Sequence, residues 1–133
     1  MLVVPTYLGL SEINGIGVFA KEDIAEGELI WEYVEGFDRE ITGEEIQALP
    51  KAAQEYLDHF SNLVEPNERY LMSRPKPRAL YLLCGDNARF MNHHHEPNLL
   101  AVGDRNCALR KISRGEELTC DYRKFDIGSS TFF

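Results

Sequence analysis

Two stretches decide the fold of this chain: RFMNHHHEPN at positions 89–98 and GEELTCDY at positions 115–122. Each places polar side chains that can bind a ligand within a largely apolar or strand-like stretch. A third stretch, Gly15-Ile16-Gly17, lies far upstream. If the three act together, the fold must bring distant parts of the chain to one pocket.

The chain has the composition of one globular domain. It has 133 residues, of which 44% are apolar and 27% charged, and a domain of this size buries roughly two thirds of its unfolded surface. No apolar run is long enough to span a membrane, and the first residues do not resemble a secretion signal. We expect a soluble intracellular protein, cytoplasmic or, in a eukaryote, nuclear.

The formal net charge of -8 bears on the partners of the protein. An acidic surface repels phosphate backbones, so we expect neither nucleic acid nor membrane as the main partner. It can attract basic protein segments, which makes a protein substrate with an accessible, basic-flanked lysine compatible with the charge. Homo-oligomer formation is left open.

Hydrophobic periodicity predicts strands at both ends of the chain and helices in the middle. Thr42 and Glu45 form a capping-box pattern that predicts a helix to about Leu49. A second helix is expected from Pro50 to about Ser61, with Ala53, Tyr56, Leu57 and Phe60 as its core stripe. The prolines and weak periodicity of residues 62–78 predict an irregular loop around a possible strand at 70–72. The other expected strands are 2–8, 17–20, 28–34, 79–83, 99–102, 107–112 and 117–120, an α+β arrangement.

The cysteines and histidines do not have the spacing of a metal site. Cys84, Cys107 and Cys120 are far apart and are expected to be free thiols in a reducing compartment. Consecutive side chains on an extended segment point to opposite faces, so the run at 93–95 does not converge on one ion. A histidine metal-binding protein is nevertheless one alternative, which metal analysis would identify.

Each stretch also has a purely structural explanation. Gly15 and Gly17 could simply build a turn between strands. Asn92 and His93 could be buried polar residues that bond to neighbouring backbone. Tyr122 could be a half-buried tyrosine at the end of a strand.

Taken in order, the three stretches resemble the motifs of SET-domain protein lysine methyltransferases. The resemblance implies small curved β-sheets with a short helical insert and a pseudoknot-like C-terminal half. It also implies binding of S-adenosyl-L-methionine by Gly15, Ile16, Gly17, Asn92, His93 and Tyr122. Tyr122 takes the position of the catalytic tyrosine, and Tyr81 and Phe125 take positions that line the path of the substrate lysine.

The resemblance divides the chain into an N-terminal core (1–36), a variable insert (37–78), a C-terminal core (79–125) and a tail (126–133). Two features depart from the family pattern. His94 and His95 stand where serine and cysteine are usual, and no cysteine-rich segment follows Tyr122. The lysine channel would therefore be closed by the insert and tail, closed by a partner, or open. A catalytically inactive SET module acting in protein–protein interaction is the main alternative.

Methyl transfer to lysine explains why such residues are needed. A neutral amine must attack the methyl carbon in line with the departing sulfur, so geometry and amine protonation control the rate. A free lysine with a pKa of about 10.4 is almost fully charged at neutral pH. An apolar channel and a nearby positive sulfonium both lower that pKa. The phenol of Tyr122 would orient the amine.

Overall fold

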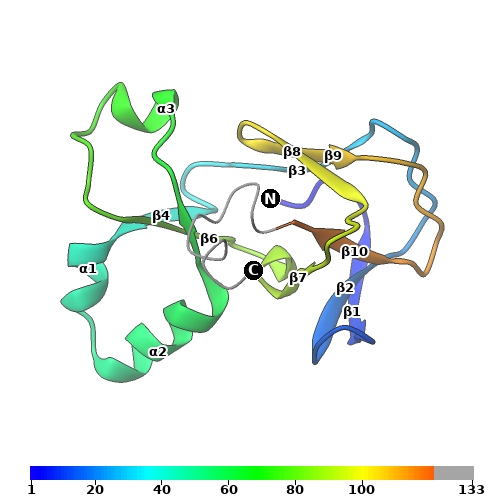
Figure 1. The fold of residues 1–133 in the computed structure, drawn as a ribbon, viewed down its shortest axis with the longest axis horizontal. Coiled ribbons are helices and arrows are strands. Elements are labelled where there is room, and N and C mark those ends of the chain that lie inside the picture. The colour runs from blue at the N-terminus through cyan, green and yellow to red at the C-terminus, as the bar shows by residue number, and fades with distance from the viewer. Residues whose placement is uncertain (122–133) are drawn as a thin grey trace.

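The structure is a computed structural model that describes residues 1–121. Its largest sheet has four strands in the order β1-β2-β10-β7 (Figure 1). β2 runs antiparallel to both β1 and β10, whereas β10 runs parallel to β7. The sheet therefore joins the beginning of the chain to two late segments. The bounds are β1 (Thr6–Leu10), β2 (Ile16–Ala20), β7 (Asn92–His93) and β10 (Glu117–Cys120).

Two three-stranded antiparallel sheets complete the described β-structure. One has the order β3-β9-β8 and the other the order β4-β6-β5. In Figure 1 the third sheet lies with the helices α1 to α3 on one side of the molecule, and the other two sheets lie opposite. The bounds are β3 (Leu29–Glu32), β4 (Arg39–Thr42), β5 (Asn62–Val64), β6 (Leu80–Leu83), β8 (Leu99–Val102) and β9 (Arg105–Ala108).

The helices are short and begin at recognisable caps. The predicted capping box is present: the Thr42 side chain accepts from the Glu45 amide, and the Glu45 carboxylate accepts from the Thr42 amide. α1 (Gly43–Gln47) ends earlier than expected, and α2 (Lys51–Phe60) follows Pro50 as predicted. The strand predicted at 70–72 is wrong. Asn67 caps α3 (Glu68–Leu71) there by accepting from the backbone of Tyr70.

A compact apolar core lies between the first two sheets. It contains the fully buried side chains of Val18, Ile30, Ile112 and Leu118, with Leu99 nearly so. Burial of each such side chain stabilises the fold by roughly 1.5–3 kcal/mol. Both chain ends of the described region contribute, so this core holds the large sheet together.

The predicted core stripe of α2 is only partly correct. Leu57 is buried, but 40% of Tyr56 is exposed, because its hydroxyl lies at the surface and accepts from Arg89. Within residues 1–121, no helix is long and apolar enough to cross a membrane.

The α+β class is confirmed, and the strand boundaries differ from the predictions in places. β1 begins at Thr6 rather than at position 2, and β9 ends at Ala108 rather than at position 112. The proposed division between insert and C-terminal core cuts through the third sheet, because β6 pairs with β4 and β5. Core and insert boundaries therefore remain a proposal.

Candidate active site

The side chain of Asn92 joins all three sequence motifs. Its amide nitrogen Nδ2 donates to the backbone oxygens of Asn14 and Ile16, at 3.1 and 3.2 Å, and to Oε2 of Glu117, at 2.9 Å. Asn92 is 8% exposed, so these bonds satisfy a buried donor that would otherwise be costly. Asn92 is therefore a buried polar residue bonded to backbone, as its structural explanation requires. The backbone it bonds to, at Asn14 and Ile16, belongs to the turn predicted to bind the cofactor.

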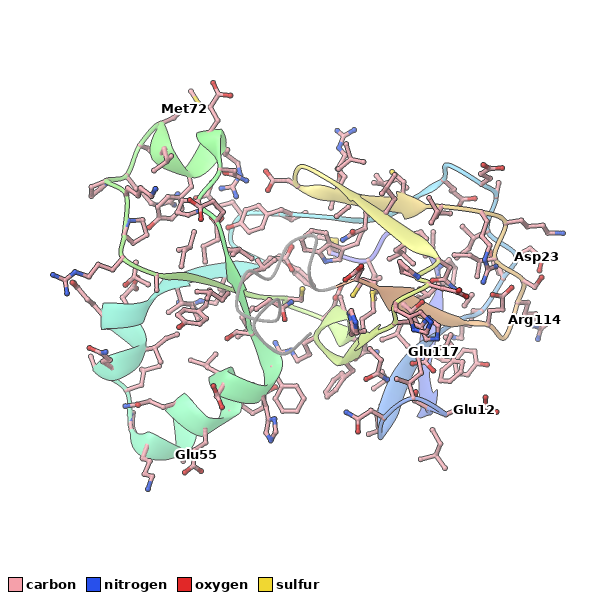
Figure 2. All side chains as sticks on the ribbon, in the orientation of Figure 1. Glu12, Asp23, Glu55, Met72, Arg114 and Glu117 are labelled. Atoms are coloured by element: carbon pink, nitrogen blue, oxygen red, sulfur yellow. The ribbon has the colours of Figure 1, made fainter. Side chains whose placement is uncertain are left out.

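Glu117 is a residue of this site that sequence reasoning did not single out. In addition to Asn92, its carboxylate accepts from the hydroxyl of Ser11, at 2.7 and 2.9 Å. Figure 2 shows Glu117 beside the β1–β2 hairpin, whose turn carries Glu12. A glutamate at the start of a strand usually faces solvent, so its residue type alone gave no signal. The carboxylate holds the hairpin and Asn92 in one arrangement.

The two glycines of the turn have different roles. Gly15 has a φ of +52°, and a Cβ there would meet nothing within 4 Å, so its outer side is open. A Cβ on Gly17 would lie 2.4 Å from Oε2 of Glu117, so this position must stay small for the carboxylate to approach. Ile16 between them is 49% exposed. The turn thus presents open backbone and an apolar side chain, which fits a flat, polar-edged ligand such as a nucleoside.

The parallel pairing of β7 and β10 places the second and third motifs side by side. Asn92 is opposite Thr119, and His93 is opposite Cys120. Asn98 fixes this register: its Nδ2 donates to the Glu117 carbonyl at 2.8 Å, and its Oδ1 accepts from the Thr119 amide at 2.8 Å. The buried Asn98 therefore pins the loop after β7 against β10.

His93 lies at the end of this strand pair, with Nδ1 3.7 Å from Oδ1 of the buried Asp121. The rings of His94 and His95 stack with centroids 4.6 Å apart, and His94 Nδ1 accepts from the Glu96 amide. His93 thus faces Asp121, whereas His94 and His95 stack on each other. Tyr122 and Phe125 lie outside the described residues.

A hollow of about 350 Å³ lies next to this strand pair. Met91 and Cys120 are among the residues that line it, together with Tyr33, Phe60 and Leu82. Because side chains alternate along a strand, Met91 and Asn92 face opposite sides, as do Cys120 and Thr119. One side of the β7–β10 pair therefore carries the Gly15 turn and the other carries an aromatic hollow.

Tyr33 is held in the hollow by charged neighbours. The guanidinium of Arg69 lies 4.1 Å from the centre of its ring. Arg69 also makes two bonds to Glu40, at 2.8 and 3.0 Å, and one to Asp104 at 2.9 Å. Burial, followed by the nearby carboxylate of Glu40, raises the pKa of Tyr33 to about 12. The phenol is therefore neutral at any physiological pH.

Tyr81 lies elsewhere. It is paired with Ile41 and Leu63 within the third sheet, and its ring lines a second hollow with Gly43 and Tyr70. The role of Tyr81 in the lysine path stays a prediction. Its position at the second hollow, away from Asn92, does not favour that role. Tyr33 and Phe60 were not chosen from the sequence, because an aromatic residue at strand or helix spacing is usually part of the core.

Comparison with known proteins agrees with this geometry. The family model for the SET domain matches residues 15–123, which includes all three motifs. The chain belongs to the SET-domain family. The fold expectation drawn from the resemblance is thereby confirmed.

Among curated proteins, the chain is 34% identical over 120 residues to an H3 lysine-36 specific histone-lysine N-methyltransferase of Candida albicans, covering 84% of this chain and 13% of that protein. It is 31% identical over 137 residues to the histone-lysine N-methyltransferase trithorax of Drosophila virilis, covering 88% of this chain and 3% of that protein. The chain thus spans only a small part of the length of these relatives.

Solved structures give the same result. A humanized mutant of the Chaetomium thermophilum Polycomb Repressive Complex 2 aligns with a TM-score of 0.61 and 26% identity, covering 92% of this chain and 15% of that chain. The Neurospora SET domain protein DIM-5, a histone lysine methyltransferase, aligns with a TM-score of 0.57 and 25% identity, covering 91% and 53%.

Proposed function

We propose that the protein transfers the methyl group of S-adenosyl-L-methionine to lysine side chains of a protein substrate. The observation that carries this proposal is the position of Asn92, whose side chain bonds both to the Gly15 turn and to Glu117. Three motifs that could each be explained structurally thereby converge on one site. The histone-lysine methyltransferases among the relatives support a histone as the first substrate to examine.

The two sides of the β7–β10 pair suit an in-line displacement. In such a reaction the attacking nitrogen and the departing sulfur lie on opposite sides of the methyl carbon. The Gly15 turn and Asn92 would hold the methyl donor on one side. The hollow beyond Met91 and Cys120 would admit the lysine from the other.

The proposed cofactor contacts combine exposed residues, Gly15 and Ile16, with the buried Gly17 and Asn92. Because Nδ2 of Asn92 is bonded within the protein, Oδ1 and the backbone would contact the cofactor. The open side of Gly15, the exposed Ile16 and the backbone of Gly17 would lie along it, and His93 would complete the site. When bound, the cofactor supplies a methyl group on a positively charged sulfur.

The proposed lysine path favours the neutral amine. Tyr33 and Phe60 would enclose the amine in an apolar, aromatic environment, which lowers its pKa and accepts methylated ammonium on the ring faces. Glu40 and Asp104 line the hollow but are bonded to Arg69, so the exposed carboxylate of Glu65, which also lines it, would favour a basic substrate segment. Tyr122 would orient the reacting nitrogen, and Phe125 remains a proposed neighbour of the path.

Calorimetry with S-adenosyl-L-methionine, followed by methyl labelling of histones and other lysine-rich proteins, tests this proposal. We expect cofactor binding and label on lysine. Tyr122→Phe should keep cofactor affinity and lose most labelling. Cofactor binding without any labelling would instead favour the inactive interaction module, and unchanged labelling by Tyr122→Phe would contradict the role of this tyrosine.

A further inference from the structure

The segment RPKPR at positions 74–78 carries three positive charges in five residues, in a chain with a net charge of -8. It connects α3 to β6 and contains neither helix nor strand. In Figure 1 this connection runs along the outer edge of the molecule, away from the β1–β2 hairpin, and in Figure 2 Met72 marks its beginning. The segment is thus a basic peptide displayed on an acidic protein.

The flanking prolines favour an extended backbone at its central lysine. Lys76 lies between Pro75 and Pro77. A residue that precedes proline is driven out of the helical region and into an extended conformation. An extended lysine can insert its side chain into a narrow channel without prior unfolding, so little conformational entropy would be lost on binding.

The side chain of Lys76 is free to leave its present position. It is 68% exposed, and its ammonium lies 3.5 Å from a carboxylate oxygen of Glu65, which is itself 63% exposed. An exposed ion pair of this kind contributes at most about 1 kcal/mol. The pair would therefore not prevent the amine from entering another site.

The other lysines of the described region are less suited to enter a channel. Lys51 is the first residue of α2. Lys111 immediately precedes Ile112, whose backbone is bridged to Ile24. Lys21 directly follows β2, and its amide donates to the carbonyl of Pro5. Each of these backbones is tied to the fold, and Lys76 alone among the four is flanked by prolines.

We propose that Lys76 is a methylation site of this protein, modified by the hollow beside Met91 in a second copy of the chain. The inference rests on the proposed function. The reaction is proposed to be intermolecular because Lys76 itself lines the second hollow, with Tyr81, and only its ion-pair partner Glu65 is among the residues that line the first. Arg74 is bonded to Glu35 of its own chain at 2.8 Å, whereas Arg78 is exposed and would approach Glu65, an exposed carboxylate that lines the first hollow.

Methylation of Lys76 requires no reagent other than the sulfonium methyl donor and water. The ammonium of Lys76 first loses a proton to water. The nitrogen lone pair then forms a bond to the methyl carbon as the carbon–sulfur bond breaks. The electron pair of that bond stays on sulfur, which leaves as a neutral thioether, and the methylated amine carries the positive charge.

The test incubates the whole protein with S-adenosyl-L-methionine carrying a labelled methyl group and locates the label by peptide mass spectrometry. Wild type should carry label at Lys76, with an initial rate that rises with the square of protein concentration. Lys76→Arg should reduce labelling of the chain to background, and the matched variant Lys51→Arg should not. Both variants should label histones as wild type does.

Three results would overturn the inference. Label at another lysine would contradict the site, and a rate proportional to protein concentration would contradict transfer between copies. Label on histones but none on the chain itself would refute this inference and leave the proposed function intact. If neither histones nor the chain were labelled, the proposed function would fail as well, so the two failures are distinguishable.

Discussion

The Nδ2 atom of Asn92 donates to Oε2 of Glu117 across 2.9 Å, and the two residues lie 25 positions apart in the sequence. Glu117 also accepts from Ser11 at the base of the hairpin turn. This carboxylate is therefore a shared anchor for the turn and for the amide that contacts it. Charge-assisted bonds of this type contribute roughly 1.5–3 kcal/mol each.

Glu117→Gln should weaken cofactor binding. The new amide nitrogen would compete with Nδ2 of Asn92 as a donor, and the charge that strengthens both bonds would be lost. We expect affinity for S-adenosyl-L-methionine, measured by calorimetry, to fall about tenfold, which corresponds to about 1.4 kcal/mol. Glu12→Gln, in the same hairpin but exposed, is the matched control. Equal affinity of wild type and Glu117→Gln would refute the anchoring role.

Gly17→Ala should destabilise the same arrangement by a steric route. The added Cβ would lie 2.4 Å from Oε2 of Glu117, and overpacking of this kind costs roughly 1–3 kcal/mol. Denaturant unfolding should show the loss. The control is Gly43→Ala, because a Cβ there makes an ordinary contact of 3.5 Å with Ala79.

A double-mutant cycle makes the steric prediction sharper. If the methyl group acts on the carboxylate, the free-energy cost of Gly17→Ala should shrink in a Glu117→Ala background, where the carboxylate is absent. Strict additivity of the two changes would show that Gly17 is small for another reason.

The sequence predicted those elements whose signals are local. The side chains of Thr42 and Glu45 determine where α1 begins, alternation identified β3, and short strand-like runs identified β2 and β6. The short strands β4, β5 and β7 were missed, because pairing with distant partners rather than local propensity creates them. The helix at Tyr70 was missed for a related reason: the apolar residues suggested a strand, and the cap of Asn67 was overlooked.

Residues of the site could be predicted from the sequence only where their type was unusual among the neighbouring residues in the chain. Asn92 stood out because a polar amide follows Phe90 and Met91. Glu117 and Tyr33 did not, since a strand routinely carries an exposed glutamate or a packed tyrosine. Their importance comes from the register of β10 with β7 and from the contact of Arg69 with the ring of Tyr33, both of which join distant parts of the chain.

Tyr33 should ionise at unusually high pH. Its pKa in the folded protein is about 12, above the ordinary value of 10.0, chiefly because of burial. The difference in tyrosinate absorbance between wild type and Tyr33→Phe should therefore show one phenol titrating near 12. A difference curve centred near 10.0 would contradict the position of Tyr33, half-buried beside Glu40.

The same shift has a consequence for stability. Between pH 10.0 and about 12 the unfolded chain has already lost the Tyr33 proton and the folded chain has not. The unfolded state then binds fewer protons, so the contribution of Tyr33 to stability is present below pH 10.0 and is lost as pH rises through this window. Tyr33→Phe should show a smaller fall in unfolding free energy over that range.

The cysteines should react with alkylating reagents in a defined order. Burial, and secondly the carboxylate of Asp38, raises the pKa of Cys84 to about 12, and the thiolate is the reactive form. Cys107 is partly exposed, whereas Cys84 and Cys120 are buried. Iodoacetamide should label Cys107 first and the other two only on unfolding. Rapid labelling of Cys84 in the folded protein, located by peptide mass spectrometry, would contradict its burial.

The central claim is that the Gly15 turn, Asn92 and the end of β10 form one cofactor site beside the aromatic hollow. A crystal structure of the protein with S-adenosyl-L-homocysteine, the demethylated cofactor, tests it most directly. We predict that the ligand lies against the turn and Asn92, with its sulfur directed toward the hydroxyl of Tyr122 and the hollow lined by Tyr33. A ligand bound elsewhere, or a Tyr122 hydroxyl far from Asn92 and His93, would contradict the account.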